Sequence, residues 1–428
     1  MRTFALFLVC ALISGTRASA EVKTMTLRQA IELAMQQNPE VMLARLDQEK
    51  ARLQAVIAHD PFVPKVFAGS GAAYPFGFPA NIEGEAPSLV NVKTQMAIFN
   101  RPQSLQVAQE KEHMRGAEMD VSKRQDEVAY RVASLFVDAE QAARSLEAVQ
   151  NEIANLKRVH DLADARVQEG RELSIIAKRA ALDIRRAQNQ IDSLSLNLDN
   201  AETSLAMALG MGPDDRVRAA QEEPLTLAVP ASEDATIAQA IQDSRDIKRL
   251  ESDIQAKMLQ VREYRAERLP KVNLIAQYEL FAHYYYQNYY ANFQSNSGQL
   301  GASIELPLLV GHSAKAYMTQ AEDDIAKLRI QVNRTRAQIT ADLRRAYQDV
   351  KRAEDLREYA REDLDLAREQ LSIDLAQNDE GRLPMAAVEQ ARAVEQEKWL
   401  AYYDAQHTAE IARLNLLHQA GTLMAALK

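Results

Sequence analysis

Residues 269–308 read LPKVNLIAQYELFAHYYYQNYYANFQSNSGQLGASIELPL, and the two arms of this stretch alternate apolar with polar side chains. Apolar residues occupy every second position from Leu274 to Leu280 and again from Leu300 to Leu308. The polar residues between them include Gln277, Glu279, Ser303 and Glu305. Alternation of period two over about ten residues, on both sides of a polar loop, is typical of a transmembrane β-hairpin. We therefore predict a hairpin here, and we expect these four polar residues to face the lumen of a barrel.

The loop between the two arms is crowded with aromatic rings. It holds Tyr284, Tyr285, Tyr286, Tyr289, Tyr290 and Phe293. Rings of this kind form girdles where a protein meets the membrane–water interface. The loop therefore favours a bilayer location, and the alternative is a soluble hairpin with a Tyr-rich tip.

The chain also carries an internal duplication. Three short motifs each occur twice, offset by about 206 to 211 positions. The pairs are Gln29-Ala30-Ile31 with Gln239-Ala240-Ile241, Val63-Pro64-Lys65-Val66 with Leu269-Pro270-Lys271-Val272, and Glu169-Gly170-Arg171 with Glu380-Gly381-Arg382. Repetition of all three motifs in the same order indicates two structural repeats.

This duplication sets the expected organisation of the chain. The first repeat covers residues 21–212 with a hairpin at about 64–99, a linker follows at 213–235, and the second repeat covers residues 236–428 with a hairpin at about 270–309. The first hairpin has the weaker pattern. Its second arm alternates apolar residues with Asn91 and Lys93, whereas its first arm is rich in Gly and Ala.

Between the hairpins, the sequence is typical of long coiled coils. Proline is absent between Pro102 and Pro213, and again between Pro307 and Pro384, so long helices can run there. Apolar residues in these stretches follow heptad spacing, which keeps one seam facing a partner helix. The expected helices are 101–168 and 313–378, each beside two shorter helices placed end to end, 27–59 with 172–208 and 236–268 with 382–420.

The first twenty residues have the features of an export signal. Arg2 supplies a basic start, residues 4–13 are an apolar run, and Ala18-Ser19-Ala20 has the form of a signal-peptidase site. We therefore expect residues 1–20 to be a signal peptide. The one cysteine of the chain, Cys10, lies inside it, so we expect a mature protein without disulfides.

Composition and motifs exclude several classes of function. A formal net charge of −9 disfavours nucleic-acid binding, which needs a basic face. The seven histidines show no HxxxH or HExxH spacing, and no GxxxxGK[ST] loop for phosphates is present. No acid, base and nucleophile can be named as a set. We therefore expect no enzyme, and no catalytic, cofactor-binding or metal-binding residues.

The duplicated motifs resemble those of the outer-membrane efflux protein (TolC) family over nearly all of residues 24–424. The resemblance is carried by Thr26–Ile31 leading to Asn38-Pro39, by Leu269–Val272, by Ile304–Leu309, and by Gly170 and Gly381. It implies a mainly α fold with a β-barrel portion, in which duplicated antiparallel coiled-coil helices carry two transmembrane β-hairpins per chain. It also implies a homotrimer in the outer membrane, with a barrel of about twelve strands, a periplasmic helical tunnel, and docking to a periplasmic adaptor and an inner-membrane pump.

The resemblance places the two Gly turns at the periplasmic tip of the tunnel. The residues expected at this tip, where an adaptor docks, are Glu169, Gly170, Arg171, Glu172, Asp379, Glu380, Gly381 and Arg382. Ordinary solvated turns are the alternative, because helix turns are commonly charged. The chain departs from the family after the second turn, where members often carry acidic residues. Ala386-Ala387-Val388 stand there with Glu389 and Glu395 nearby, so the sequence leaves the presence of an acidic selectivity ring open.

Two functions follow from these features. The first is the exit duct of a tripartite efflux or type I secretion system, which conducts substrates passively. The second is a secreted periplasmic coiled-coil scaffold or adaptor whose β segments stay outside the bilayer. Drugs, metals and proteins all remain open as cargo.

Overall fold

A computed structural model of the chain describes residues 22–71, 88–170, 173–212, 214–220, 228–281, 296–308 and 311–427. The expected signal peptide, the Tyr-rich loop and the tip residues Arg171 and Glu172 lie outside these residues. The chain divides into two compact units, each described by itself. The turn unit comprises Met1–Pro39, Asp126–Ala231 and Arg345–Lys428, and the sheet unit comprises Glu40–Gln125 and Ser232–Arg344.

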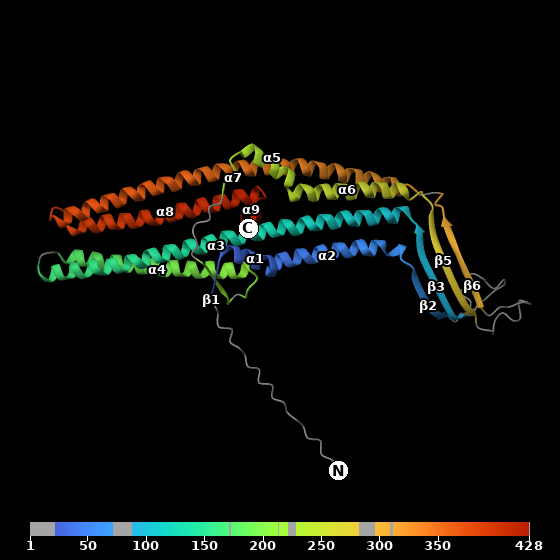
Figure 1. The fold of residues 1–428 in the computed structure, drawn as a ribbon, viewed down its shortest axis with the longest axis horizontal. Helices are drawn as coiled ribbons and strands as arrows, with labels where there is room; N and C mark the ends of the chain where they lie inside the picture. The colour runs from blue at the N-terminus through green and yellow to red at the C-terminus, as the bar shows by residue number, and fades with distance from the viewer. Residues whose placement is uncertain are drawn as a thin grey trace, which may run out of the picture. The chain divides into compact units, whose positions relative to one another are not determined.

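A four-stranded antiparallel sheet forms one end of the sheet unit (Figure 1). Its strands are β2 (Lys65–Gly71), β3 (Ser88–Phe99), β5 (Lys271–Phe281) and β6 (Asn296–Glu305), in the order β2-β3-β5-β6. Both predicted hairpins are therefore present as paired strands. The Gly- and Ala-rich arm of the first hairpin is the short strand β2, and β3 joins the two hairpins by pairing with β5.

The register of the sheet separates a polar face from an apolar face. Residues directly opposite each other in adjacent strands share a face. On one face the cross-strand pairs are Asn91 with Glu279, Lys93 with Gln277, Asn273 with Ser303, and Lys271 with Glu305. The neighbouring pairs, which include Val92 with Tyr278 and Ala276 with Leu300, therefore lie on the other face. The four predicted polar residues of the second hairpin thus share one side of the sheet.

Five helical segments and a short turn complete the sheet unit. They are α2 (Pro39–His59) with the 3₁₀ turn η1 (Asp60–Phe62), α5 (Glu233–Asp243), α6 (Arg245–Ala266), and the sheet-proximal parts of α3 (Arg101–Gln168) and α7 (Ser313–Asp379). The bounds of α3 match the prediction, and α7 is one residue longer than predicted.

Two of the expected helices are each broken into two, which corrects the prediction. The segment expected as one helix over 27–59 is α1 (Leu27–Gln37) followed by α2, with Asn38 extended at φ −62° and ψ 126°. Proline has no N–H and disfavours the helical region for the residue before it, so Pro39 explains this break. The segment 236–268 breaks at Ser244, whose side chain accepts a hydrogen bond from the N–H of Ile247 and so starts α6.

In the turn unit, each long helix pairs with an antiparallel shorter helix. The shorter partners are α4 (Ser174–Ala208) beside α3 and α8 (Met385–Gln419) beside α7, and α9 (Leu423–Ala426) follows (Figure 1). Heptad positions of α3 are buried as predicted, among them Val128, Val132 and Val149. Leu364 and Ala367 of α7 are buried in the same way. Interlocking apolar residues from paired helices therefore form the core here.

A two-stranded parallel sheet in the turn unit was not foreseen. Strand β1 (Val22–Met25) pairs with β4 (Arg216–Ala219), which lies inside the stretch expected to be a linker. Two ion pairs tie β4 to α4, Arg216 with Asp199 and Arg218 with Glu202 at 2.8 Å. Glu202 is 1% exposed, so its carboxylate is buried against the strand.

Candidate functional site: the turn end and the polar sheet face

Glycine reverses the chain at both predicted turns of the turn unit. Gly170 has φ +67° and Gly381 has φ +73°, a backbone region that other residues seldom adopt. A Cβ at either position would meet nothing within 4 Å. The backbone conformation, not crowding, therefore requires glycine at both turns.

The second turn is held by backbone and side-chain contacts of its own residues. The N–H of Arg382 donates to the carbonyl of Gln377 at 2.9 Å, and the side-chain amide of Asn378 donates to the carbonyl of Leu383 at 2.7 Å. Arg382 and Glu380 form an ion pair of 3.0 Å while both stay exposed. Such an exposed pair contributes only about 0–1 kcal/mol, so it can be broken easily.

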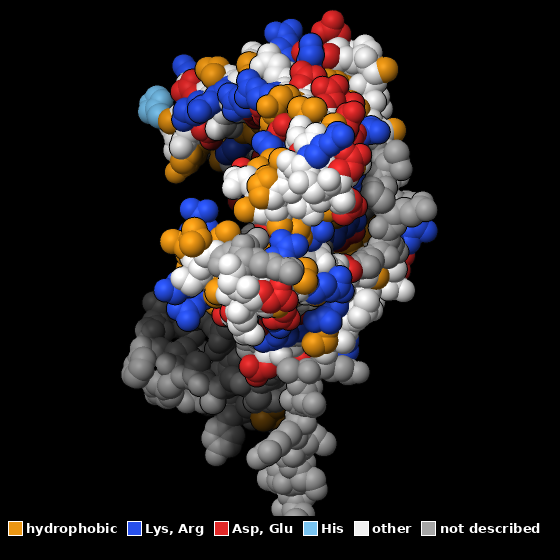
Figure 2. Space-filling model, turned by 90° about the vertical axis from the view of Figure 1, so that its left-hand side faces the viewer, with side chains coloured by type: hydrophobic (Ala, Val, Ile, Leu, Met, Phe, Trp, Pro, Cys, Tyr) orange, Lys and Arg blue, Asp and Glu red, His pale blue; other side chains and the backbone are white. Residues whose placement is uncertain are grey.

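Acidic and basic side chains intermingle at the end of the turn unit (Figure 2). Of the eight predicted tip residues, the structure describes six, and it places Asp379, Glu380, Gly381 and Arg382 together at the turn between α7 and α8. Glu169 and Gly170 lie directly after the last residue of α3. Sequence reasoning therefore located both turns.

On the polar face of the sheet, Glu279 is held between two amides. Its Oε1 accepts a hydrogen bond from Asn91 Nδ2 at 2.7 Å and another from Gln277 Nε2. Ser303 and Glu305 lie opposite Asn273 and Lys271 on the same face. Asn91 was not among the predicted lumen residues, although the alternation in its strand is visible in the sequence. Only the strand order shows that it contacts Glu279.

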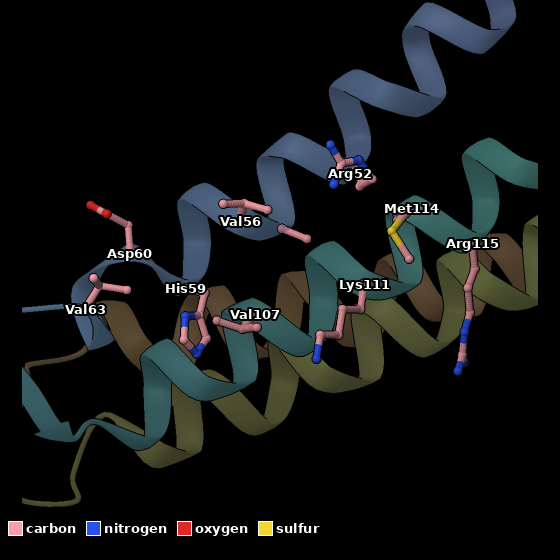
Figure 3. Close-up of a pocket in the computed structure, with 10 residues that line it drawn as sticks. Arg52, Val56, His59, Asp60, Val63, Val107, Lys111, Met114 and Arg115 are labelled. Atoms are coloured by element: carbon pink, nitrogen blue, oxygen red, sulfur yellow. The ribbon is translucent and has the colours of Figure 1, made fainter.

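An open groove between α2 and α3 is a feature that the sequence did not reveal (Figure 3). It encloses about 470 Å³, and its lining includes Val56, Val63, Val107 and Met114. The basic side chains of Arg52, Lys111 and Arg115 also line it. Val56 in this lining is 57% exposed, and Leu53 and Ile57 on the same helix are 46% and 62% exposed. The groove therefore combines apolar and basic side chains, with Asp60 as the one acidic residue among the described residues that line it.

The described residues offer little for metal chemistry. Among them, no three or more His, Cys, Asp or Glu side chains are grouped so as to hold a metal ion. In the same part of the chain, each helix is too short or too polar to cross a membrane.

Comparison with known proteins identifies the family. Residues 30–211 and 236–422 match the outer membrane efflux protein family, and the chain belongs to it. No curated protein sequence matches the chain closely enough to count as a relative. The two matched segments correspond to the helix-and-hairpin repeats, and they leave out the stretch that contains β4.

Solved structures of channels share the fold at low sequence identity. CusC is 14% identical with a TM-score of 0.75, covering 92% of each chain. The outer membrane protein VceC from Vibrio cholerae is 18% identical with a TM-score of 0.72, covering 92% of this chain and 96% of its own. The outer membrane channel MtrE from Neisseria gonorrhoeae is 15% identical with a TM-score of 0.73, covering 93% and 89%.

These findings confirm the predicted fold class, in which duplicated coiled-coil helices carry two β-hairpins. The protein is an outer-membrane efflux channel by family, located in the outer membrane with its helical part in the periplasm. The family and the fold are those of channels, not of enzymes.

Proposed function

We propose that three copies of this chain form a passive exit duct, which receives substrates from a periplasmic adaptor and an inner-membrane pump. The open sheet is the observation that carries this proposal. Strands β2 and β6 are the outer strands of the described sheet, so each has one edge without a neighbouring strand. Open edges are not tolerated in lipid, where every backbone group needs a partner. Three four-stranded sheets would close a barrel of about twelve strands.

Apolar residues on both edge strands support assembly from several copies. Val66 on β2 is 66% exposed, and Leu300 and Ile304 on β6 are 80% and 72% exposed. All three lie on the apolar face, which in a barrel would meet lipid or the adjoining strand. The groove between α2 and α3 offers a similar apolar surface among the helices. We infer that a neighbouring subunit covers the groove in the trimer.

The polar face of the sheet would then line the lumen. Glu279 and Glu305 would project into water, together with Gln277 and Ser303, while the opposite face meets lipid. We further propose the organisation that the sequence suggests, a signal peptide at 1–20, repeats at 21–212 and 236–428, and a connecting segment at 213–235 that includes β4.

The Gly turns would form the end that an adaptor grips. In a trimer the two turns would occur three times each, which makes a ring of six. Six of the proposed tip residues are Glu169, Gly170, Asp379, Glu380, Gly381 and Arg382. Arg171 and Glu172 complete the proposed set. We expect Arg382→Glu to raise the resting conductance in planar bilayers, because it replaces the Arg382–Glu380 ion pair by repulsion.

Assembly and location test the proposal directly. Light scattering of the detergent-solubilised protein should give the mass of three chains, and cell fractionation should place it in the outer membrane with heat-modifiable mobility. A monodisperse monomer with full β content would overturn the trimer. A fully soluble periplasmic protein would instead favour the scaffold, and copurification would identify the adaptor, the pump and hence the cargo.

A further inference from the structure

The contact between α3 and α8 in the turn unit includes several polar side-chain pairs. Asp138 Oδ1 and His407 Nε2 lie 2.7 Å apart, and Gln141 Nε2 donates to Asp404 Oδ1 at 2.7 Å. Further along, the ring of Tyr130 stacks on the ring of His418 in α8, with 4.6 Å between the ring centres. We call this contact the α3–α8 seam. It joins helices from the two halves of the chain, and side-chain polar groups hold it together at several heights.

Towards the Gly turns, polar groups in the seam lack partners. The Oε1 atom of Glu389 and the Nε2 atom of Gln396 are buried and make no hydrogen bond. The two residues are seven positions apart on α8, so they lie on the same side of the helix. Arg392 forms an ion pair with Glu389 at 3.9 Å, and both side chains are mostly buried. Burial removes much of the water that would solvate an ionised Glu389, and the long ion pair with Arg392 compensates for only part of that loss.

Carboxylates from three helices surround this point. Burial raises the pKa of Glu389, and the negative charges of Glu152 on α3 and Asp183 on α4 raise it further, whereas Arg392 opposes them. Burial likewise raises the pKa of Glu152, against the opposing effects of a hydrogen bond from its own helix and of Arg392. Glu395 adds a smaller effect that raises the pKa of Glu152.

Two cations of α4 and α7 are engaged with other carboxylates of this region. Arg186 on α4 pairs with Asp183 at 3.2 Å, and Arg368 on α7 pairs with Glu395 at 3.8 Å. Arg368 also lies 4.2 Å from the centre of the Trp399 ring. Arg392 is thus the cation whose effect is shared by Glu152 and Glu389. One positive charge faces two carboxylates that the packed seam disfavours in their ionised form.

We propose that the α3–α8 seam is a proton-operated latch, which tightens when Glu152 and Glu389 take up protons and loosens when they lose them. The packed seam binds these two protons more tightly than an open seam does, so protonation stabilises the packed state. This extra stability is fully present below the ordinary glutamate pKa of about 4.3, and it is lost as the pH rises through the raised pKa values of Glu152 and Glu389.

If the chain forms the proposed duct, the latch regulates it. The Glu389 end of the seam lies towards the turns that would form the end of the tunnel, so an acid periplasm would hold that end shut and a neutral one would ease its opening. This consequence rests on the proposed function. The latch itself is a property of the packing of the turn unit.

Hydrogen exchange of the full-length protein in detergent measures the stability of the seam and does not depend on channel conductance. Protection of residues 385–400 is compared at pH 5.0 and pH 7.5, after correction for the intrinsic pH dependence of exchange. We expect protection to fall as pH rises, by at most about tenfold per pH unit for each carboxylate that loses its proton. The double variant Glu152→Gln/Glu389→Gln mimics the protonated seam, so it should keep the high protection at both pH values.

Glu397→Gln is the matched control, since it removes one exposed carboxylate from the same helix. Its pH response should equal that of the unmodified protein. A change in protection of less than about twofold in the unmodified protein would overturn the latch. So would an unchanged pH response in the double variant, or in both single variants if the double variant does not fold. Missing conductance in bilayers, with the exchange pattern intact, would refute the duct and leave the latch supported.

Discussion

Arginine placed on either side of one strand should separate the lipid face of the sheet from its lumen face. Leu300 and Gln299 are neighbours on β6 and face opposite sides. Leu300 lies opposite Ala276 on the apolar face, and Gln299 lies opposite Gln277 on the polar face. The substitutions Leu300→Arg and Gln299→Arg therefore introduce the same side chain at nearly the same depth. They differ in the medium that the charge enters, lipid for Leu300→Arg and water for Gln299→Arg.

The expected cost follows from the position of Leu300 in its strand. β6 has 10 residues, which span roughly 33 Å along the strand at about 3.3 Å each. With a tilt of about 40°, this corresponds to the height of the apolar band of a membrane barrel, about 25 Å. Leu300 is near the middle of the strand, so Leu300→Arg should cost about 2–4 kcal/mol per chain and three times that in a trimer. Gln299→Arg should cost less than about 1 kcal/mol, because its charge stays in water.

The assay is urea titration of the protein folded into lipid vesicles, with the heat-modifiable gel shift reporting folded trimer. Leu300→Arg should lower the urea midpoint strongly or prevent insertion, while Gln299→Arg should fold to normal amounts and shift the ion preference of the channel. Equal damage from the two variants would refute the assignment of faces. So would a harmless Leu300→Arg beside a damaging Gln299→Arg.

Two further predictions concern the turn unit. Gly210 has φ +84°, and a Cβ there would lie 2.5 Å from the carbonyl oxygen of Gln37, so Gly210→Ala should destabilise the protein by more than the roughly 1–2 kcal/mol of left-handed strain. Gly381→Ala is the control in the same thermal unfolding series, because Gly381 has a similar φ and a Cβ there would meet no atom within 4 Å. Equal losses of stability in the two variants would contradict the role of the Gln37 contact. Arg218→Ala leaves the buried Glu202 carboxylate without its ion partner and should cost about 1–3 kcal/mol, an amount limited by the half-exposed Arg218, whereas an unchanged melting temperature would show that the pair contributes nothing.

Sequence patterns between residues a few positions apart predicted most of the helices and strands. The heptads and the absence of proline from Pro102 to Pro213 predicted α3 with its observed bounds, because each residue contributes to a helix through neighbours three and four positions away. The alternation around Glu279 predicted β5 and the side to which its polar residues point. Gly170 and Gly381 marked both turns, since glycine alone enters the left-handed region at little cost.

The same patterns missed features that depend on distant partners. Arg216–Ala219 is too short and too charged to read as a strand, and it forms β4 only because β1 and α4 lie beside it. The break at Ser244 has no proline to announce it. The hydrogen bond from the N–H of Ile247 to the Ser244 side chain marks the start of α6, and the tertiary structure was needed to find it.

The sequence by itself determined most of the helices and strands, the two Gly turns and the polar side of the second hairpin, because these properties depend on residues a few positions apart. Only the tertiary structure decided which segments meet. It placed Asn91 against Glu279, 188 positions away, and buried Glu389 near Glu152 and Arg392 in the α3–α8 seam. Seen alone, Glu389 is one more charge on a helix that carries many. Its environment arises when α3, α4 and α8 exclude water from it together, and no local pattern records that.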